Sequence, residues 1–303
     1  MLRSVILAAS RSPRVERLVA ALPATRDLAH RFVAGVDADD ALHAATDAIG
    51  GGRSVTLEHL GPATHTVEAA TAIRDEYVEL LTRLAAAGLT PAGDVTVRLS
   101  ALGRRFDERF AYDNARAVCA AAAAAGTSVT LGMEDHTTTD PTLDVLLKLR
   151  EEYPATGVTL QAYLRRTESD CRDLAAAGSR VRLCRGGYRE PESVAYRSAR
   201  DIGKSYVRCA KVLLAGDGYP MFATADPRLI AIIEDRSRWF DRRPDQFEFQ
   251  LRYGVRPSEQ ERLVTQGYTV RIQIPYGRDW YPHLMRRLAV RPAVLGRALL
   301  PAG

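Results

Sequence analysis

Short runs rich in apolar and β-branched residues alternate along the chain with longer amphipathic segments. The runs predict strands at 54–60, 95–99, 128–131, 158–163, 180–184, 221–224, 246–251 and 269–274. The longer segments predict helices at 66–87, 107–125, 141–152, 167–177, 192–215, 227–240, 257–266 and 281–299. Strands separated by helix-length segments pair in parallel through crossover connections. The pattern therefore predicts an α/β fold, a TIM-like (β/α)8 barrel.

The first part of the chain follows a different pattern. Residues 1–49 are predicted to form short helices, with apolar side chains on one face at Val15, Leu18, Val19 and Leu22. Three glycines at 50–52 then interrupt the helical pattern before the first strand. We expect an N-terminal helical segment over 1–49 and a single barrel domain over 50–303, since barrels of this kind form one domain at this length.

Composition narrows the class of protein. With 46% hydrophobic and 26% charged residues, the chain has ample material for a globular core. The net charge of +5 comes from scattered arginines rather than basic runs, so we expect no nucleic-acid partner. No apolar stretch is long enough for stable membrane insertion, and we expect a cytoplasmic protein. The four cysteines lack CxxC spacing and no histidine cluster accompanies them, so no metal site is predicted.

Polar residues occupy strand positions that should point into the barrel. Side chains alternate along a strand, and six polar residues share the parity predicted to face the barrel axis: Arg98, Gln161, Arg182, Gln250, Arg252 and Gln273. Charged side chains are almost never buried without a partner. Several arginines near one barrel mouth therefore predict a bound anion. The alternative, a one-residue error in strand parity, is weakest for Arg182 and stays open for Arg252.

A pair of arginines lies in the last predicted helix. Arg286 and Arg287 follow the final strand closely, so the first turns of this helix are expected over the barrel mouth. Planar guanidinium groups bind a carboxylate or a phosphate in a bidentate manner. The pair is therefore a candidate anion clamp.

Four segments together resemble proline dehydrogenases, flavoenzymes that begin proline breakdown. The segments are RLCRGGY at 182–188, FEFQ at 247–250, PYGRDWYP at 275–282 and LMRRLA at 284–289. Shorter matches occur at 99–102 and 218–220, so the resemblance covers nearly the whole chain. It implies a distorted (β/α)8 barrel that holds FAD. It also implies hydride transfer to flavin N5 from a carbon next to the substrate nitrogen.

The resemblance also implies roles for individual residues. Arg286 and Arg287 correspond to the pair that clamps the substrate carboxylate, and Tyr188 is implied beside the substrate. The implied flavin contacts are Gln161, Arg182, Arg185, Gly186 and Thr224. A cation near the flavin favours the negative charge of the reduced ring.

Several positions differ from the family pattern, and most of them belong to the substrate pocket. Arginine stands in place of the family's lysine at Arg98 and Arg185, and in place of an apolar residue at Arg252. Two acidic residues of the family are replaced, an aspartate by Gly132 and another acidic residue by Pro62. Two tyrosines of the family are replaced by Gln273 and His283, and a histidine is replaced by Ala225. Two lost acidic groups and one added arginine change the local balance by about three positive charges. We therefore expect Arg98 and Arg252, with Gln273, to form a pocket that lacks acidic partners and selects a substrate more acidic than proline.

The leading hypothesis is thus FAD-dependent oxidation of proline, a proline-like amino compound or an amino diacid. Its electron acceptor is left open between a quinone and oxygen, and peripheral membrane contact stays an alternative to a purely cytoplasmic location. One competing hypothesis is a degenerate barrel that binds an anionic metabolite without turnover. Another is a phosphate-binding aldolase or isomerase, for which a phosphate loop is expected after strands 7 or 8. Only residues 276–278 offer such a loop here.

Overall fold

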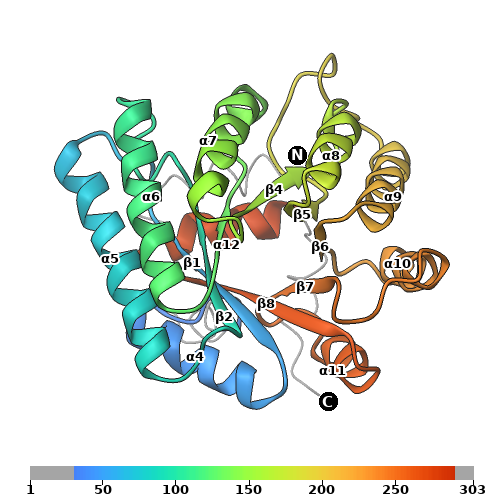
Figure 1. The fold of residues 1–303 in the computed structure, drawn as a ribbon, viewed down its shortest axis with the longest axis horizontal. Helices are drawn as coiled ribbons and strands as arrows, with labels where there is room; N and C mark the ends of the chain where they lie inside the picture. Colours follow the sequence, from blue (N-terminus) through green and yellow to red (C-terminus); the bar gives the residue numbers. More distant parts are fainter. Residues whose placement is uncertain (1–30, 291–303) are drawn as a thin grey trace.

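The computed structural model describes the backbone of residues 31–290 and the side chains of residues 31–285. Parallel strands close into a barrel in chain order, as predicted (Figure 1). The strands are β1 (Ser54–His59), β2 (Gly93–Val97), β3 (Val129–Leu131), β4 (Gly157–Gln161), β5 (Arg180–Cys184), β6 (Tyr219–Ala223), β7 (Glu248–Arg252) and β8 (Thr269–Tyr276). Each predicted strand overlaps an observed one, with bounds that differ by up to two residues.

Helices surround the barrel and return the chain from the carboxyl end of each strand to the start of the next. They are α5 (Val67–Ala86), α6 (Glu108–Ala124), α7 (Thr139–Glu152, preceded by the 3-10 turn η1, His136–Thr138), α8 (Thr167–Ala176), α9 (Ala199–Ala215), α10 (Pro227–Trp239) and α11 (Pro257–Thr265). Side-chain caps fix several starts: Thr66 and Asp107 accept hydrogen bonds from the first turns of α5 and α6. Between residues 31 and 290, no helix combines the length and apolar character needed to cross a membrane.

The start of α9 differs from the prediction. A helix was expected from residue 192, but α9 begins at Ala199, where the Ser198 side chain accepts a hydrogen bond from the Asp201 N–H. The preceding residues pair instead with the segment after β4, because the Tyr196 N–H donates to the Tyr163 carbonyl at 2.8 Å. Residues 185–198 therefore form a long loop at the barrel mouth.

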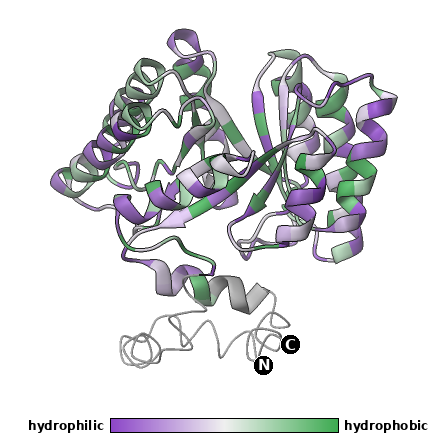
Figure 2. Ribbon diagram, turned by 90° about the horizontal axis from the view of Figure 1, so that it is seen from below, coloured by the Kyte–Doolittle hydropathy of each residue, from purple (hydrophilic) through white to green (hydrophobic). Residues whose placement is uncertain are grey.

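An additional helix takes the place of the eighth helix in the outer ring. Helix α4 (Ala38–Gly50) packs against β8 and β1, and its start carries a capping box between Asp37 and Asp40 (Figure 1). The helix after β8, α12 (Trp280–Val290), consequently lies across one end of the barrel instead of in the ring (Figures 1 and 2). The predicted helices before residue 31, with their apolar face at 15–22, and residues 291–299 of the last predicted helix lie outside the described residues.

The two faces of the barrel sheet differ in chemistry. Outward side chains such as Leu57, Leu131 and Phe249 are fully buried and pack against the helices, whose own apolar faces are visible in Figure 2. The inward side chains are mostly polar, and several of them are buried. The hydrophobic core therefore lies between strands and helices, while the barrel interior is built from polar contacts.

An ion network closes the amino-terminal part of the interior. The Arg271 guanidinium donates to Glu248 Oε1 at 2.8 Å and lies 3.3 Å from Asp94 Oδ2. It also donates to the carbonyls of Val55 and Ala92, at 2.8 and 2.9 Å. Burial alone would raise the pKa of the Glu248 carboxyl, but Arg271, with smaller contributions from Arg180 and Gln250, lowers the pKa below its usual value. The network thus joins β1, β2, β7 and β8 through one buried cation.

Replacing the central cation should destabilise the barrel strongly. Arg271→Ala leaves the carboxylates of Glu248 and Asp94 buried without their cation, and we expect a loss of about 3–5 kcal/mol in the free energy of unfolding. Urea denaturation at neutral pH measures it. The ion pair of Arg243 with Asp245 is exposed, so Arg243→Ala serves as the control and should leave stability unchanged.

The same network predicts a pH dependence. Because the folded-state pKa of Glu248 lies below its ordinary value of 4.5, its stabilising contribution is complete above pH 4.5 and is lost as the pH falls through the lowered value. The stability difference between wild type and Arg271→Ala should shrink in acid. Equal stability of the two proteins at neutral pH would contradict the role assigned to Arg271.

Candidate active site

The strand register confirms the predicted inward positions. Arg182 on β5 donates to the Thr96 hydroxyl on β2 at 2.8 Å, across the barrel, which identifies the inward set of alternating positions. The paired residues of neighbouring strands extend this set to the other polar side chains predicted to face the axis: Arg98, Gln161, Gln250, Arg252 and Gln273. Arg252, for which parity was left open, belongs to the set but lies at the exposed end of β7.

Arg182 is a buried cation, and only part of its guanidinium group is hydrogen-bonded. Its side chain is 4% exposed, and one nitrogen donates to Thr96, whose hydroxyl oxygen is 2.9 Å from that of Thr56. The Nε and Nη2 groups are buried and have no hydrogen-bond partner among the described residues. Burial lowers the pKa of Arg182, and the carboxylates of Asp94 and Glu58 oppose this effect. An arginine nevertheless keeps its proton, so Arg182 offers a charged donor pair to an acceptor at the barrel centre.

Gln161 lies next to a turn that connects several parts of the mouth. Its Nε2 donates to the Glu134 carbonyl at 2.7 Å. The Glu134 carboxylate accepts from the Ser100 hydroxyl at 2.6 Å and from the Ser100 N–H at 3.2 Å. The turn after β3 thus ties the end of β4 to the loop that follows β2.

Arg98 has an acidic partner that the sequence analysis did not include. Its Nε is 3.6 Å from Glu58 Oε1, and Glu58 occupies an inward position at the carboxyl end of β1. Burial alone would lower the pKa of Arg98, but Glu58 and other nearby groups raise it. A Cβ at Gly132 would lie 3.0 Å from Arg98 Cγ, so this glycine leaves room for the arginine stem. The expectation that Arg98 lacks an acidic partner is therefore wrong.

The loop from 185 to 198 carries Arg185, Gly186 and Tyr188. Gly186 has φ +95°, and a Cβ there would lie 2.1 Å from the Tyr163 ring, so only glycine fits at this position. Arg185 is half-buried, and its carbonyl accepts from the Tyr163 N–H at 3.0 Å. Tyr188 is 44% exposed at the rim.

The remaining described candidates lie on β6, β7 and β8. The Thr224 hydroxyl, directly after β6, accepts from the Asp226 N–H at 3.1 Å and so shapes the turn into α10. The Gln273 amide donates to Gln250 Oε1 at 3.0 Å, and the Gln250 amide donates to Glu248 at 2.5 Å. A chain of polar contacts therefore runs from the ion network to the mouth.

Arg286 and Arg287 are carried by α12, the helix that crosses the end of the barrel. Their side chains lie outside the described part of the structure. Tyr281 and Leu284, on the preceding turn, are buried. The fold thus brings the helix with the arginine pair to the same end of the barrel as the inward polar residues.

Comparison with known proteins identifies the family. The sequence matches the family described as proline dehydrogenase over residues 41–289. It is 35% identical over 295 residues to a proline dehydrogenase of Deinococcus radiodurans, a match that covers 96% of this chain and 94% of the relative. The chain belongs to the proline dehydrogenase family. It is also 32% identical over 269 residues to proline dehydrogenase 2 of Bacillus subtilis, covering 89% of this chain and 88% of the relative.

A solved structure supports the same assignment. Proline utilization A (PutA) of Bdellovibrio bacteriovorus, crystallised after inactivation by N-propargylglycine, superposes with a TM-score of 0.83 at 25% sequence identity. The match covers 91% of this chain and 33% of the PutA chain, so this protein spans about a third of that larger protein. Like other proline dehydrogenases, the protein is an FAD-dependent oxidoreductase.

The donors of the barrel mouth fit this cofactor. A flavin presents carbonyl and ring-nitrogen acceptors, and the Nε and Nη2 of Arg182, which no described residue satisfies, are suitable buried donors. Among the residues with described side chains, no group of three or more histidine, cysteine, aspartate or glutamate residues is arranged to hold a metal ion.

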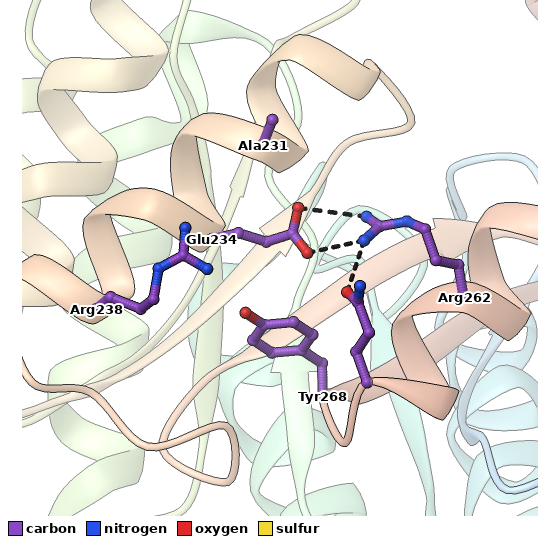
Figure 3. Close-up of a pocket in the computed structure, with 6 residues that line it drawn as sticks. Ala231, Glu234, Arg238, Arg262 and Tyr268 are labelled. Atoms are coloured by element: carbon purple, nitrogen blue, oxygen red, sulfur yellow. Dashed lines mark hydrogen bonds and ion pairs between the residues drawn. The ribbon is translucent and has the colours of Figure 1, made fainter.

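A surface cavity of about 340 Å³ lies elsewhere, between α10, α11 and the start of β8 (Figure 3). Two of its three charged lining residues are paired with each other, since Glu234 accepts from Arg262 at 3.0 and 3.3 Å. Tyr268 directly precedes β8, which places this cavity toward the amino ends of the strands, away from the inward residues of the mouth. It is not part of the candidate active site.

Sequence reasoning missed the acidic residues that hold the site together. Glu58 and Glu248 share the inward parity of residues that were recognised, so the same alternation rule could have found them. Glu190, in the loop after β5, carries no such periodic signal. Its carboxylate is buried by contacts with the His136 N–H and the Tyr163 hydroxyl, which lie in other loops.

A single methyl group at residue 186 should disturb cofactor binding. Gly186→Ala places a Cβ against the Tyr163 ring and strains the backbone, so we expect reduced FAD content, measured as the ratio of flavin to protein absorbance. Gly187→Ala is a matched control, because a Cβ there meets nothing within 4 Å. Equal FAD content in both variants would show that the shape of this loop does not matter for the cofactor.

Proposed function

We propose that this protein oxidises the C–N bond of proline, or of a proline-like amino compound, by hydride transfer to N5 of bound FAD. The observation that carries the proposal is Arg182, a buried cation at the barrel centre with two donor groups that have no partner in the described part of the chain. A cation at this place favours the negative charge that develops on a flavin when it accepts hydride. The proline dehydrogenases of Deinococcus radiodurans and Bacillus subtilis support proline as the reference substrate.

We assign the individual residues to two groups. Arg182 and Gln161, together with Arg185, Gly186 and Thr224 around the mouth, would hold FAD. Arg286 and Arg287 would clamp the substrate carboxylate from α12, with Tyr188 and Gln273 beside the substrate. Holding the carboxylate by two guanidinium groups would fix the donor carbon at the distance that hydride transfer requires.

A direct test separates an enzyme from a degenerate binding barrel. The purified protein should be yellow, and anaerobic proline should bleach its flavin absorbance. N-propargylglycine, which inactivated the PutA of Bdellovibrio bacteriovorus, should inactivate this protein too. Arg182→Ala should fold, as judged by circular dichroism, but lose most of its FAD, since a charge-assisted hydrogen bond contributes about 1.5–3 kcal/mol. A wild-type protein that acquires no flavin spectrum on incubation with FAD would refute the proposal.

The finer substrate preference rests on Arg252. This residue ends β7 at the mouth and forms no ion pair with any residue whose side chain is described. Arg98, by contrast, already has Glu58 as a partner. Gly132 and Pro62 supply no carboxylate to this end of the barrel. We therefore propose that a second carboxylate on the substrate binds Arg252, so that an amino diacid is preferred to proline.

Arg252→Leu should reduce this preference. Wild type should reduce its flavin more efficiently with a dicarboxylic analogue of proline than with proline itself, by about tenfold for one charge-assisted contact. Arg252→Leu should narrow the ratio of the two kcat/KM values, mainly by raising KM for the diacid. Arg243→Leu, far from the mouth, is the control. A wild-type enzyme that oxidises proline efficiently and ignores diacids would leave proline as the substrate and remove Arg252 from the site.

A further inference from the structure

The loop that joins β5 to α9 is held by unequal attachments. Its last part pairs with the segment after β4, through the Arg165 N–H to the Val194 carbonyl at 2.9 Å and the Tyr196 N–H to the Tyr163 carbonyl at 2.8 Å. Its first residue is attached by the Arg185 carbonyl. Between these attachments lie residues 186–193, and Glu190 is the one buried residue among them.

Glu190 anchors this middle part of the loop. It is 4% exposed, although glutamate is rarely buried without partners. Its Oε1 accepts from the His136 N–H and from the Tyr163 hydroxyl, both at 3.0 Å. Its Oε2 contacts His136 Nδ1, which carries the proton when it donates to a carboxylate. Three donors therefore converge on one buried carboxylate.

The partners of Glu190 are themselves fixed. His136 begins the η1 turn, whose first residues are capped by Asp135 through the Thr137 N–H at 3.0 Å. The same turn contains Glu134, whose carbonyl accepts from the Gln161 amide. The Tyr163 ring packs against Gly186, and the Tyr163 hydroxyl donates a hydrogen bond to Glu190. Burial and the Glu190 carboxylate raise the pKa of this tyrosine, so it stays a neutral donor at physiological pH.

We propose that Glu190 is a positioning residue for the cofactor site. Through His136 and Tyr163, Glu190 fixes the position of the middle of the 185–198 loop relative to the turn after β3. The same turn binds the Gln161 amide through the Glu134 carbonyl. The inference rests on the proposed function, which places Arg185, Gly186 and Tyr188 beside FAD and the substrate. Without the carboxylate, the His136 and Tyr163 donors lose their acceptor, and the loop loses the buried side chain that links it to the η1 turn.

Substitutions at both ends of the contact test the proposal. Glu190→Ala should raise the Kd for FAD by about tenfold or more, the size expected when a charge-assisted hydrogen bond is lost. Glu190→Gln should recover most of the affinity, because a neutral His136 can change tautomer and accept from the new amide. Tyr163→Phe keeps the ring against Gly186 and removes one donor, so its effect should be intermediate.

Two measurements separate positioning from general damage. FAD titration of flavin-free protein gives the Kd, and hydrogen–deuterium exchange should show faster exchange over 186–193 in Glu190→Ala without added cofactor. The control is Glu168→Gln, which removes a carboxylate from the ion pairs of Arg208 and Arg172 on the nearby α8 and α9 surface. It should change neither quantity.

The outcomes distinguish this inference from the proposed function. If Glu190→Ala does not fold, Tyr163→Phe alone decides, through the same two measurements. Variants that match wild type in FAD affinity and exchange, or a Gln variant no better than Ala, overturn the positioning role while the proposed function stands. A wild-type protein that binds no FAD overturns both.

Discussion

The polar interior of the barrel depends on one buried cation that lies between two carboxylates at the amino-terminal end of the strands. Arg271 joins Asp94 and Glu248 and reaches the backbone of β1 as well. A polar barrel interior can form only if each buried charge has a partner, since unpaired charges cost several kcal/mol each. From this network, Gln250 and Gln273 extend the polar contacts toward the carboxyl ends of the strands.

The position of the last helix follows from the presence of α4. Because α4 packs against β8 and β1, the outer ring is complete without a helix after β8. The helix that follows β8 is then free to cross the end of the barrel. This arrangement explains how a helix late in the sequence can deliver Arg286 and Arg287 to the same end as the inward strand residues.

Charge pairing also refines the view of specificity. An inventory of replaced residues predicted several arginines without partners at the mouth. The Glu58 carboxylate balances the charge of Arg98, and Gly132 leaves room for the arginine stem. Arg98 therefore adds no unpaired positive charge to the pocket. Arg252 is the residue at which the charge argument still applies. Counting charges in a sequence overestimates the field in a pocket when the compensating residue lies on another strand.

The sequence by itself determined the barrel, the family and the inward parity of Arg98, Gln161, Arg182, Gln250 and Gln273, and it left the parity of Arg252 open. These features depend on local periodicity and on short motifs, which a single chain displays directly. Only the tertiary structure decided that α9 begins at Ala199, because pairing with the segment after β4 overrides the helical pattern of residues 192–198. It also decided which carboxylates partner which cations, and that Glu190 anchors the loop after β5. These contacts join residues tens of positions apart, and their energies depend on burial and distance, which no local pattern encodes.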